Sequence, residues 1–394
     1  MNFRTRLIHS GTERDRHYGA SSVPIYQTST YHQVDPEHLG TYDYARSDNP
    51  TREALEHAIA ELEGGARGLA FSSGMAATSS VLLLFQPGDH LIVGQEIYGG
   101  TYRVLTTLFR QWKLDVTFVD TTHPEAVRQA ITPATRALFV ETPANPLLTI
   151  TDLRAMARIA HEHNLLAITD NTFMTPYLQR PLELGFDVVV HSATKYLGGH
   201  SDLIAGLAVT RDKALGRRLK AIQNAFGAIL GPQDAWLVLR GMRTLGVRLD
   251  AQQRTAAALA RWLAARPEII RVFHPTLENH PGRETHFAQA FGGGAMIAFE
   301  FPDGATATAF LKRTRLPLVA VSLGGVESIL SYPATMSHAA LPPAERLARG
   351  ITDGLVRLSV GLEAEEDLIA DLASALSGTT VNQPPSQPNE EKQS

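Results

Sequence analysis

Short apolar runs alternate with helical patterns through the middle of the chain, and this alternation constrains the fold more than any other feature of the sequence. The runs are apolar almost throughout, as expected for strands that are covered on both faces. The segments between them are long enough for helices, as residues 153–160 illustrate. The runs cover residues 68–71, 90–93, 116–119, 137–140, 165–168, 188–190 and 206–209. The pattern predicts a doubly wound α/β core with a mostly parallel sheet.

Composition and periodicity divide the whole chain into four units. The units are an N-terminal arm and helix at 1–60, a large domain at 61–250, a smaller C-terminal α/β domain at 251–376 and a disordered tail at 377–394. The first helix follows Asn49-Pro50, and a long helical region is expected at 234–265. The tail is rich in Pro, Gln, Ser and Glu and has almost nothing to bury. In the smaller domain the expected elements are strands at 295–301 and 355–360 and a closing helix at 368–376.

Charge and cysteine content exclude several classes of function. The 394 residues carry a formal net charge of -4 and scattered basic residues, so nucleic acid is not an expected partner. The chain has no cysteine, which excludes disulfides, cysteine-ligated zinc and cysteine nucleophiles. His161 and His163 lie on different faces of a predicted helix, so no metal site is expected. The polar start and the lack of any bilayer-length apolar run predict a cytoplasmic protein with no membrane partner.

One lysine follows directly on a strongly apolar strand at residues 187–191. Lys195 stands there among small and hydroxyl-bearing residues, in the sequence Ser192-Ala193-Thr194-Lys195. Desolvation at the end of a buried strand lowers the pKa of a lysine and makes it a nucleophilic amine that can form a Schiff base with an aldehyde. Ser192 and Thr194 offer hydroxyl donors to an anionic group. The alternative is a surface lysine on a turn, which would not need these neighbours.

The turn after the first strand of the core resembles a phosphate cradle. Residues 69–77 have the pattern of a strand, a turn of small residues and the start of a helix. The free N–H groups at that helix start can bind a phosphate, and Gly74 would permit its close approach. Small residues also occur where a helix merely lies close to a sheet. Together with Lys195, however, a phosphate anchor is what pyridoxal phosphate requires.

Two further residues at strand ends suit the same cofactor. Asp170 ends an apolar strand and could lie against the pyridine nitrogen, although such an aspartate can also cap a turn. Tyr98 stands at a strand end beside two glycines and could stack on the ring, although it can also be an ordinary loop tyrosine. In parallel sheets ligands lie outside the carboxyl ends of the strands. Tyr98, Asn145, Asp170 and Lys195 all fall there, which predicts one common site.

These motifs resemble the Cys/Met-metabolism pyridoxal-phosphate enzymes, the trans-sulfuration family of cystathionine β- and γ-lyases, cystathionine γ-synthases, methionine γ-lyases and homoserine sulfhydrylases. The resemblance runs from Thr5 to about Leu376 and is strongest to the bacterial cystathionine β- and γ-lyases. The matching motifs are residues 44–51, 73–76, 98–101, 141–146, 170–172, 192–196, 322–325 and 357–361. The resemblance implies a PLP-dependent aminotransferase-like fold (fold type I), with a large domain built on a mostly parallel sheet and a smaller C-terminal α/β domain.

The resemblance also implies roles for the residues near the cofactor. Lys195 would hold the pyridoxal phosphate and move protons, Asp170 would pair with the pyridinium nitrogen, and Tyr98 would stack on the ring. Those expected to bind the phosphate are Gly74, Met75, Ser192 and Thr194. Tyr44 and Arg46 resemble residues that reach the phosphate of the neighbouring subunit's cofactor. An active homodimer, usually within a tetramer, is therefore implied.

The same resemblance assigns the substrate side of the site. Arg357 would clamp the α-carboxylate of an amino-acid substrate in the bidentate geometry that a guanidinium favours. Ser322 and Asn145 would assist it. Arg103 is kept as in relatives that use cystathionine. Without the resemblance, a strand-end salt bridge would be the preferred interpretation of Arg357.

The reaction itself depends on residues outside the shared motifs. Val321 stands where γ-acting cystathionine enzymes commonly carry glutamate, and Gly100 stands where methionine γ-lyases typically carry a reactive cysteine. Residues 224–234 and 326–333 most resemble cystathionine β-lyases of Gram-positive bacteria. We therefore expect β-elimination of cystathionine to homocysteine, pyruvate and ammonia. The alternatives are cystathionine γ-elimination, γ-replacement by a cystathionine γ-synthase or O-acetylhomoserine sulfhydrylase, and methionine γ-elimination.

Overall fold

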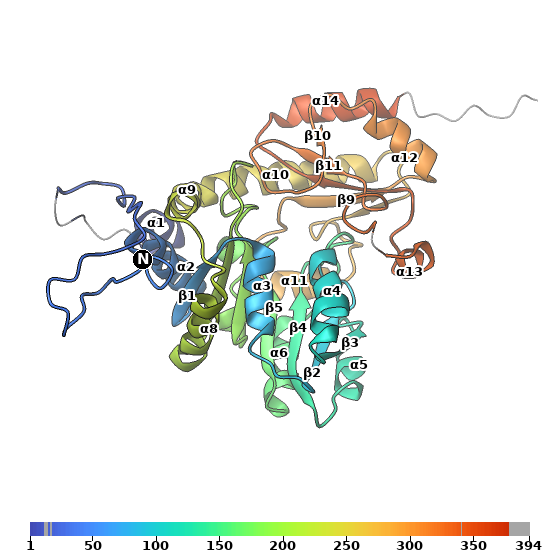
Figure 1. Ribbon diagram of the computed structural model, residues 1–394. Helices are drawn as coiled ribbons and strands as arrows, with labels where there is room; N and C mark the ends of the chain where they lie inside the picture. The colour runs from blue at the N-terminus through green and yellow to red at the C-terminus, as the bar shows by residue number, and fades with distance from the viewer. Residues whose placement is uncertain (12–14, 16–17, 340, 378–394) are drawn as a thin grey trace, which may run out of the picture.

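The predicted mostly parallel sheet is confirmed in a computed structural model, which describes residues 1–11, 15, 18–339 and 341–377 (Figure 1). The strand order is β1-β7-β6-β5-β4-β2-β3, and β7 alone runs antiparallel to its neighbours β1 and β6. The strands are β1 (Arg67–Phe71), β2 (His90–Gly94), β3 (Asp115–Val119), β4 (Thr135–Glu141), β5 (Leu166–Asp170), β6 (Val188–Ser192) and β7 (Gly206–Thr210). Each coincides with an expected run, because continuous apolar sequence is what a doubly covered strand requires.

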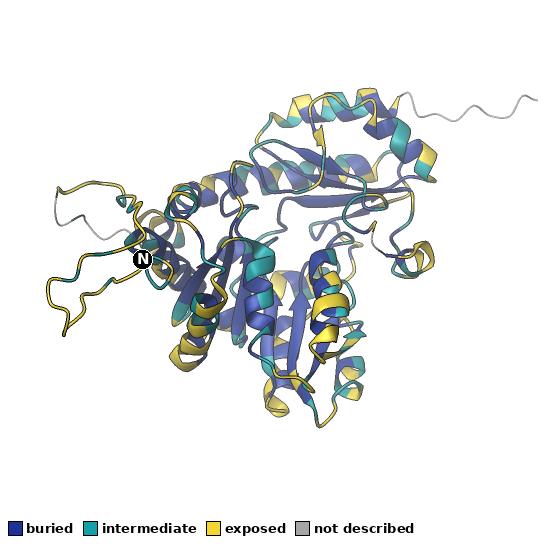
Figure 2. Ribbon diagram, in the orientation of Figure 1, coloured by how far each residue is buried: buried dark blue, intermediate teal, exposed yellow. Residues whose placement is uncertain are grey.

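Helices cover both faces of this sheet, and successive strand residues alternate between the two cores. On one face, α2 (Pro50–Glu63), α6 (Leu153–Glu162) and α9 (Pro232–Arg243) pack against inward residues such as Ala167 and Val189. On the other, α3 (Gly74–Leu82), α4 (Gly99–Val104) and α8 (Lys213–Phe226) pack against residues such as Ile168 and Val190. The strands are accordingly buried along most of their length, except the edge strand β3, where only Val119 is buried (Figure 2).

A second, mostly antiparallel sheet lies above the first in Figure 1, in the order β10-β11-β12-β9-β8. Its strands are β8 (Arg271–Phe273), β9 (Met296–Glu300), β10 (Leu318–Val319), β11 (Ile329–Ser331) and β12 (Leu355–Ser359). Helices α10 (Leu245–Ala264), α12 (Gly304–Leu311) and α14 (Glu365–Leu376) cover it. The expected strands near 295–301 and 355–360 and the closing helix are therefore present.

The helical region expected at 234–265 is not one helix. It breaks at Thr244, whose backbone has φ −103° and ψ 2° and whose hydroxyl donates to the carbonyl of Gly241. A threonine that bonds to its own helix in this way competes with the helical backbone bonds, which explains the break. The proposed domain boundary at residue 250 lies inside the second helix, α10. That helix places Leu249 in the core of the first sheet and Ala256 in the core of the second.

The N-terminal arm consists of α1 (Phe3–His9) and a largely irregular segment that projects from the body beside α2 (Figure 1). Asn49 caps α2 by accepting the N–H groups of Thr51 and Arg52, and Gly64 ends it with φ 73°. The remaining helices are α5 (Pro124–Gln129), α7 (Thr175–Leu178), α11 (Arg283–Gln289), α13 (Pro343–Ala348), the π-helix η1 (Leu105–Phe109) and the 3-10 helix η2 (Pro181–Leu184). Among the described residues, no helix combines the length and apolar character needed to cross a bilayer. The expected tail beyond residue 377 lies outside the described residues.

Candidate active site

A cavity of about 460 Å³ opens at the carboxyl ends of β2, β4, β5 and β6 and is closed by residues of the second sheet. Parallel sheets bind ligands at this edge, as the strand pattern predicts. The cavity brings together every residue predicted from the sequence except Tyr44 and Arg46. The predicted residues that line it are Gly74, Met75, Tyr98, Arg103, Asn145, Asp170, Ser192, Thr194, Lys195, Val321, Ser322 and Arg357.

Lys195 follows β6 by three residues, and its amine lies inside the cavity. Lys195 Nζ donates a hydrogen bond of 2.5 Å to Ser322 Oγ, a residue of the smaller domain. Burial, and then the positive charge of Arg357, lower the pKa of Lys195 to about 8. Ser322 has φ 89°, a conformation that residues with a Cβ rarely adopt. The site thus contains an amine that loses its proton more readily than an ordinary lysine, and a strained loop presents a hydroxyl to it.

Asp170 ends β5, and its carboxyl group is buried beside that of Glu141. The two residues are register partners on β4 and β5, so their side chains leave the sheet on the same face. Asp170 Oδ1 accepts the N–H of Thr172 at 2.9 Å. Burial raises the pKa of Asp170, while the bonds from Thr172 and the charge of His191 lower it. A cation against Asp170, such as a protonated ring nitrogen, would offset the cost of burying this carboxylate.

Glu141 is the site residue that sequence reasoning missed, although it lies within a matching motif. Its Oε2 accepts the N–H of Tyr98 at 2.8 Å and its Oε1 the N–H of Asn145 at 3.3 Å, so it fixes two loops of the site. Burial, with the charge of Asp170 next, raises the pKa of Glu141 well above its usual value. The available signal was its position at the carboxyl end of an apolar strand, the same argument that identified Asp170.

The turn between β1 and α3, where the sequence predicts a phosphate cradle, lies at the edge of the cavity. Ser73 caps α3 by accepting the N–H of Ala76, and Gly74 and Met75, the first residues of that helix, line the cavity. A Cβ on Gly74 would come within 2.8 Å of the Cβ of Ser192, so only glycine permits this approach. The Thr194 hydroxyl accepts the N–H of Ala205. An anion cradle, an amine and a carboxylate around one cavity fit pyridoxal phosphate.

Arg357, on β12, is a buried cation that faces the cavity. Its Nη1 donates to Asn145 Oδ1 at 2.7 Å, and its Nη2 donates to Ser322 O at 2.8 Å and to Ser331 Oγ at 3.1 Å. Burial lowers the pKa of Arg357 to about 10, which leaves it charged at neutral pH. Its partners are neutral groups, no carboxylate of the described residues pairs with it, and its Nε has no partner among them. A substrate carboxylate would supply the missing countercharge.

The mouth of the cavity is formed by Tyr98, Arg103 and Val321. The Val321 side chain is exposed, and no carboxylate stands at this position. Arg103 is exposed on α4. A Cβ on Gly100 would come within 2.4 Å of the Tyr98 ring, so a cysteine there would displace the ring.

Tyr44 and Arg46 lie outside this cavity. Arg46 Nη1 donates to the carbonyl of Asn224 at 2.7 Å, at the end of α8, and its guanidinium lies 5.6 Å from the centre of the Tyr44 ring. Both residues are exposed. Within one chain they therefore contribute nothing to the site.

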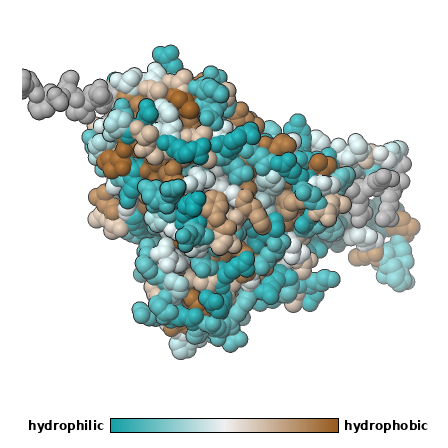
Figure 3. Space-filling model, turned by 180° about the vertical axis from the view of Figure 1, so that it is seen from behind, coloured by the Kyte–Doolittle hydropathy of each residue, from teal (hydrophilic) through white to brown (hydrophobic). Residues whose placement is uncertain are grey.

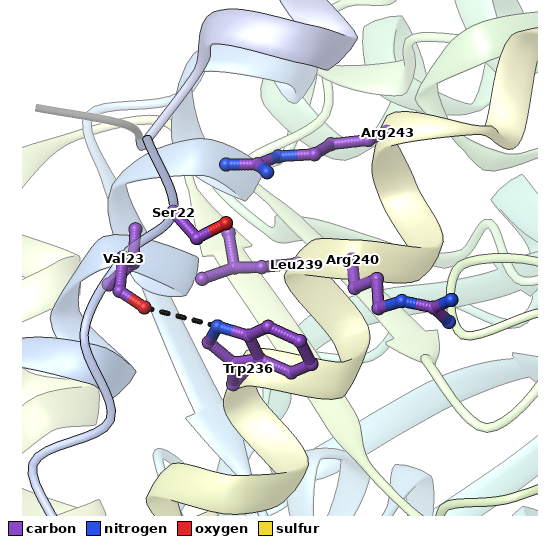
Figure 4. A pocket seen from close by; sticks show the side chains of 6 residues that line it. All are labelled: Ser22, Val23, Trp236, Leu239, Arg240 and Arg243. Atoms are coloured by element: carbon purple, nitrogen blue, oxygen red, sulfur yellow. Dashed lines mark hydrogen bonds between the residues drawn. The ribbon is translucent and has the colours of Figure 1, made fainter. Parts of the chain in front are cut away.

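A second hollow, of about 170 Å³, lies where the N-terminal segment crosses α9 (Figure 4). It contains none of the predicted site residues; its lining is Ser22, Val23, Trp236, Leu239, Arg240 and Arg243. The indole N–H of Trp236 donates to the carbonyl of Val23 and ties the segment to the helix. Arg240 and Arg243 point away from each other, so their charges do not converge on one ligand.

Comparison with known proteins agrees with this geometry. The model of the Cys/Met metabolism PLP-dependent enzymes matches residues 4–377. The chain belongs to this family. It is 53% identical over 372 residues to the cystathionine beta-lyase MetC of Bacillus subtilis (strain 168), covering 94% of this chain and 95% of that protein. It is 50% identical over 377 residues to the cystathionine gamma-lyase of the same organism, covering 95% and 99%.

Solved structures of the Cys/Met metabolism family confirm the fold. A cystathionine gamma-lyase from Lactobacillus plantarum, complexed with L-serine, superposes with a TM-score of 0.94 at 47% identity and covers 96% of this chain and 99% of that one. A cystathionine gamma synthase from Xanthomonas oryzae pv. oryzae gives 0.94 at 42% identity, covering 96% and 98%. The chain is thus a pyridoxal-phosphate enzyme of fold type I that acts in cysteine and methionine metabolism.

Proposed function

We propose that this enzyme is a carbon–sulfur lyase that cleaves cystathionine by β-elimination to homocysteine, pyruvate and ammonia. The observation that carries this choice is Val321, an exposed apolar side chain at the cavity mouth. It cannot pair with the distal ammonium of cystathionine, as a glutamate there could. The similarity at 53% identity to a cystathionine beta-lyase supports the same choice.

The arrangement of charged groups supports the common first half of the reaction. Bound pyridoxal phosphate supplies the electron sink that allows a proton to leave the substrate α-carbon. Arg357 would hold the α-carboxylate, and Asp170 would pair with the ring nitrogen. Lys195, whose pKa is lowered to about 8, is the base that takes the α-proton. Ser322 orients the Lys195 amine through their hydrogen bond.

The outcome after the α-proton has left depends on how the distal end of the substrate is held. In β-elimination the thiolate leaves from Cβ, whereas γ-elimination first needs a second proton removed from Cβ. Arg103 offers an exposed cation at the mouth, and Val321 offers no countercharge to an ammonium. The substrate is therefore held mainly through Arg357 and the cofactor. Under these conditions β-elimination, which needs no second proton removal, is the favoured reaction.

The test is to supply cystathionine and identify the oxo acid. Pyruvate as the main product supports the proposal, and 2-oxobutyrate would establish γ-elimination, the activity named for a relative at 50% identity. A second assay with O-acetylhomoserine and sulfide tests γ-replacement, because another relative, at 47% identity, is named a cystathionine gamma-synthase/O-acetylhomoserine (thiol)-lyase.

We further propose that the enzyme is a cytoplasmic homo-oligomer, a dimer at least and a tetramer by family resemblance. Tyr44 and Arg46 are exposed and do not line the cavity of their own chain, as expected of residues that serve a neighbour. The same arm exposes Val34 and Leu39 to solvent. By contrast, apolar and polar side chains are interspersed over the body as seen from behind (Figure 3). Sedimentation and cell fractionation would test both statements.

A further inference from the structure

An arginine is buried where the N-terminal arm joins the body of the molecule. Arg52 lies in the first turn of α2, and only 1% of its surface is exposed. The N-terminal end of a helix favours acidic side chains, and a buried cation loses its hydration. Neither the helix nor apolar packing therefore explains an arginine at this position, and the groups that bind it must offset the cost of burying it.

The partners of Arg52 are the carbonyl groups of three successive residues of the arm. Its Nη1 donates to the carbonyl of Ala45 at 2.8 Å, and its Nη2 donates to those of Arg46 and Ser47 at 3.3 and 3.1 Å. Carbonyl groups that point toward one place repel one another, and a cation among them offsets that repulsion. Because a guanidinium carries its donors in a rigid fork, the three bonds fix the backbone orientation of all three residues.

The segment that Arg52 binds carries the two residues proposed to serve the neighbouring subunit, Tyr44 and Arg46. The carbonyl of Tyr44 accepts the N–H of Ser47 at 3.0 Å, which closes this segment into a turn. The side chains of Tyr44 and Arg46 are exposed, whereas the carbonyl group of Arg46 is bonded to Arg52. The backbone of the turn is thus fixed from the body of its own chain, and its two side chains remain accessible to another chain.

Glu56 compensates the charge of Arg52 and ties it to the first sheet. Arg52 Nε lies 3.8 Å from Glu56 Oε1, one turn further along α2, and both side chains are buried. The same carboxylate oxygen accepts the N–H of Ala70, on β1, at 3.0 Å. Arg52 is therefore held at a fixed position relative to the sheet, and the turn that it binds is held there with it.

We propose that Arg52 is a positioning residue that holds Tyr44 and Arg46 in place for the cofactor phosphate of the neighbouring subunit. The inference rests on the proposed oligomer, in which Tyr44 and Arg46 serve a neighbour. It adds that a residue buried inside one chain controls how tightly the other chain binds its cofactor. A residue that only stabilised its own chain would not have this effect.

Arg52→Lys is the test variant, because lysine keeps a cation beside Glu56 but has no planar fork that can bind three carbonyl groups at once. In the homo-oligomer the dissociation constant of pyridoxal phosphate should rise about tenfold, as for the loss of one charge-assisted contact to a phosphate. Borohydride fixation measures this binding without turnover, because it counts cofactor only at sites that contain Lys195.

Mixed oligomers, verified by mass, show in which chain the defect acts. When Arg52→Lys is mixed with Lys195→Ala, the site with the working lysine receives its arm from the Lys195→Ala chain. The affinity of that site for the cofactor should return to the wild-type value. When Arg52→Lys is mixed with Arg46→Ala, every site receives a defective arm, and the affinity should stay low.

Arg248→Lys is the matched control, because Arg248 is a second buried arginine, and its partners, Thr244 Oγ1 and the carbonyl of Gly241, are not part of the arm. Mixing this variant with Lys195→Ala should leave the affinity of its lysine site unchanged. The proposal is overturned if the defect of Arg52→Lys persists in the mixture with Lys195→Ala, or if Arg248→Lys is restored in the same way.

The double variant Arg52→Gln, Glu56→Gln covers the case in which Arg52→Lys does not fold. It removes the two buried charges together, so that neither is left without the other, and it should show the same defect and the same recovery. Failure of the shared site gives a different result, because Arg46→Ala and Lys195→Ala would then not complement each other. Failure of the present inference leaves that complementation intact and abolishes only the recovery of the Arg52 variants.

Discussion

At the scale of single residues, the site depends on a few side chains whose environments change their chemistry. The Lys195 amine is partly withdrawn from water and donates a hydrogen bond to the hydroxyl of Ser322. Arg357 keeps its charge although no carboxylate of the described residues forms an ion pair with it. An amino-acid substrate requires a base near its α-carbon and a cation for its α-carboxylate. Lys195 and Arg357 can supply these two groups.

If Lys195 carries the cofactor, the purified protein will be yellow, and borohydride will fix the cofactor to the peptide that contains Lys195. Lys195→Ala should lose nearly all turnover, because Lys195 is the one lysine of the described residues that lines the cavity. Lys220→Ala is the control, since Lys220 is a largely buried lysine held by the carbonyl of Ser47 and the carboxylate of Asp48. Peptide mapping that finds the label on another lysine would contradict the assignment.

Val321→Glu tests the choice of scissile bond. A carboxylate at this position can pair with the distal ammonium of cystathionine, a charge-assisted contact worth roughly 1.5–3 kcal/mol. If it acts on only one binding mode, the fraction of 2-oxobutyrate should rise about tenfold or more over a minor wild-type background. The two oxo acids are separated and quantified by chromatography.

Val319→Glu is the control for that substitution, because Val319 is also exposed but does not line the cavity. Its product ratio should equal that of the wild type. An unchanged ratio in Val321→Glu, or 2-oxobutyrate as the main wild-type product, would show that position 321 does not govern the reaction.

At the scale of elements, the segment from β8 to β9 links the two sheets through buried histidines. His280 Nε2 lies 3.0 Å from the carbonyl of Leu148, which belongs to the first sheet's core, and His286 Nε2 lies 2.8 Å from that of Gly292. Burial lowers the pKa of His274 to about 3, of His286 to about 4, and that of His280 as well. The segment thus tolerates its histidines only in the neutral form.

These pKa values predict a loss of stability in acid. The unfolded chain binds protons at its histidines near pH 6.5, whereas the folded chain does not, so the free energy of unfolding falls as the pH decreases below about 6.5. Each histidine contributes up to about 1.4 kcal/mol per pH unit until its folded pKa is reached. For His286 this window extends down to about pH 4.

The measurement is denaturant unfolding of His286→Gln and wild type between pH 7.5 and 4.5. The variant should be less stable at pH 7.5, and the difference should shrink toward acid by about 1.4 kcal/mol per pH unit. His123→Gln, at a largely exposed histidine, should parallel the wild type. A constant difference between His286→Gln and wild type would show that His286 does not titrate on unfolding.

At the scale of the whole molecule, the arm at residues 18–48 is separated from the cavity that its residues are expected to serve. Arg46→Ala should weaken retention of the cofactor, because the phosphate would lose a cation from the neighbouring chain. Mixing Arg46→Ala with Lys195→Ala should restore some activity, since one hybrid site receives both an intact arm and an intact lysine. The readout is turnover in mixed oligomers that have been verified by mass.

Arg243→Ala offers a control for the mixing experiment, because Arg243 lies in the hollow beside the arm and not in the cavity. Its cofactor retention should equal that of the wild type. Mixed oligomers of Arg46→Ala and Lys195→Ala that recover no activity would argue against a shared site.

The sequence by itself determined most of the strands and the polar residues at the ends of these strands. The strands of the first sheet, apart from the edge strand β3, were predictable because burial on both faces leaves a continuous apolar run. The positions of Asp170 and Lys195 at the cavity were predictable because they end or closely follow such runs. The family was predictable because its motifs are short and contiguous. The break at Thr244 was not, because it depends on one side-chain hydrogen bond within an otherwise helical pattern.

Only the tertiary structure decided which of these residues meet. Ser322 contacts Lys195 across 127 residues of sequence, and Arg357 contacts Asn145 across 212. Glu141 acquires its role because β4 lies beside β5. Apolar periodicity reports how deeply a segment is buried but not which segment lies next to it. The order of strands and the docking of one sheet over another arise from long-range packing that no local stretch of sequence contains.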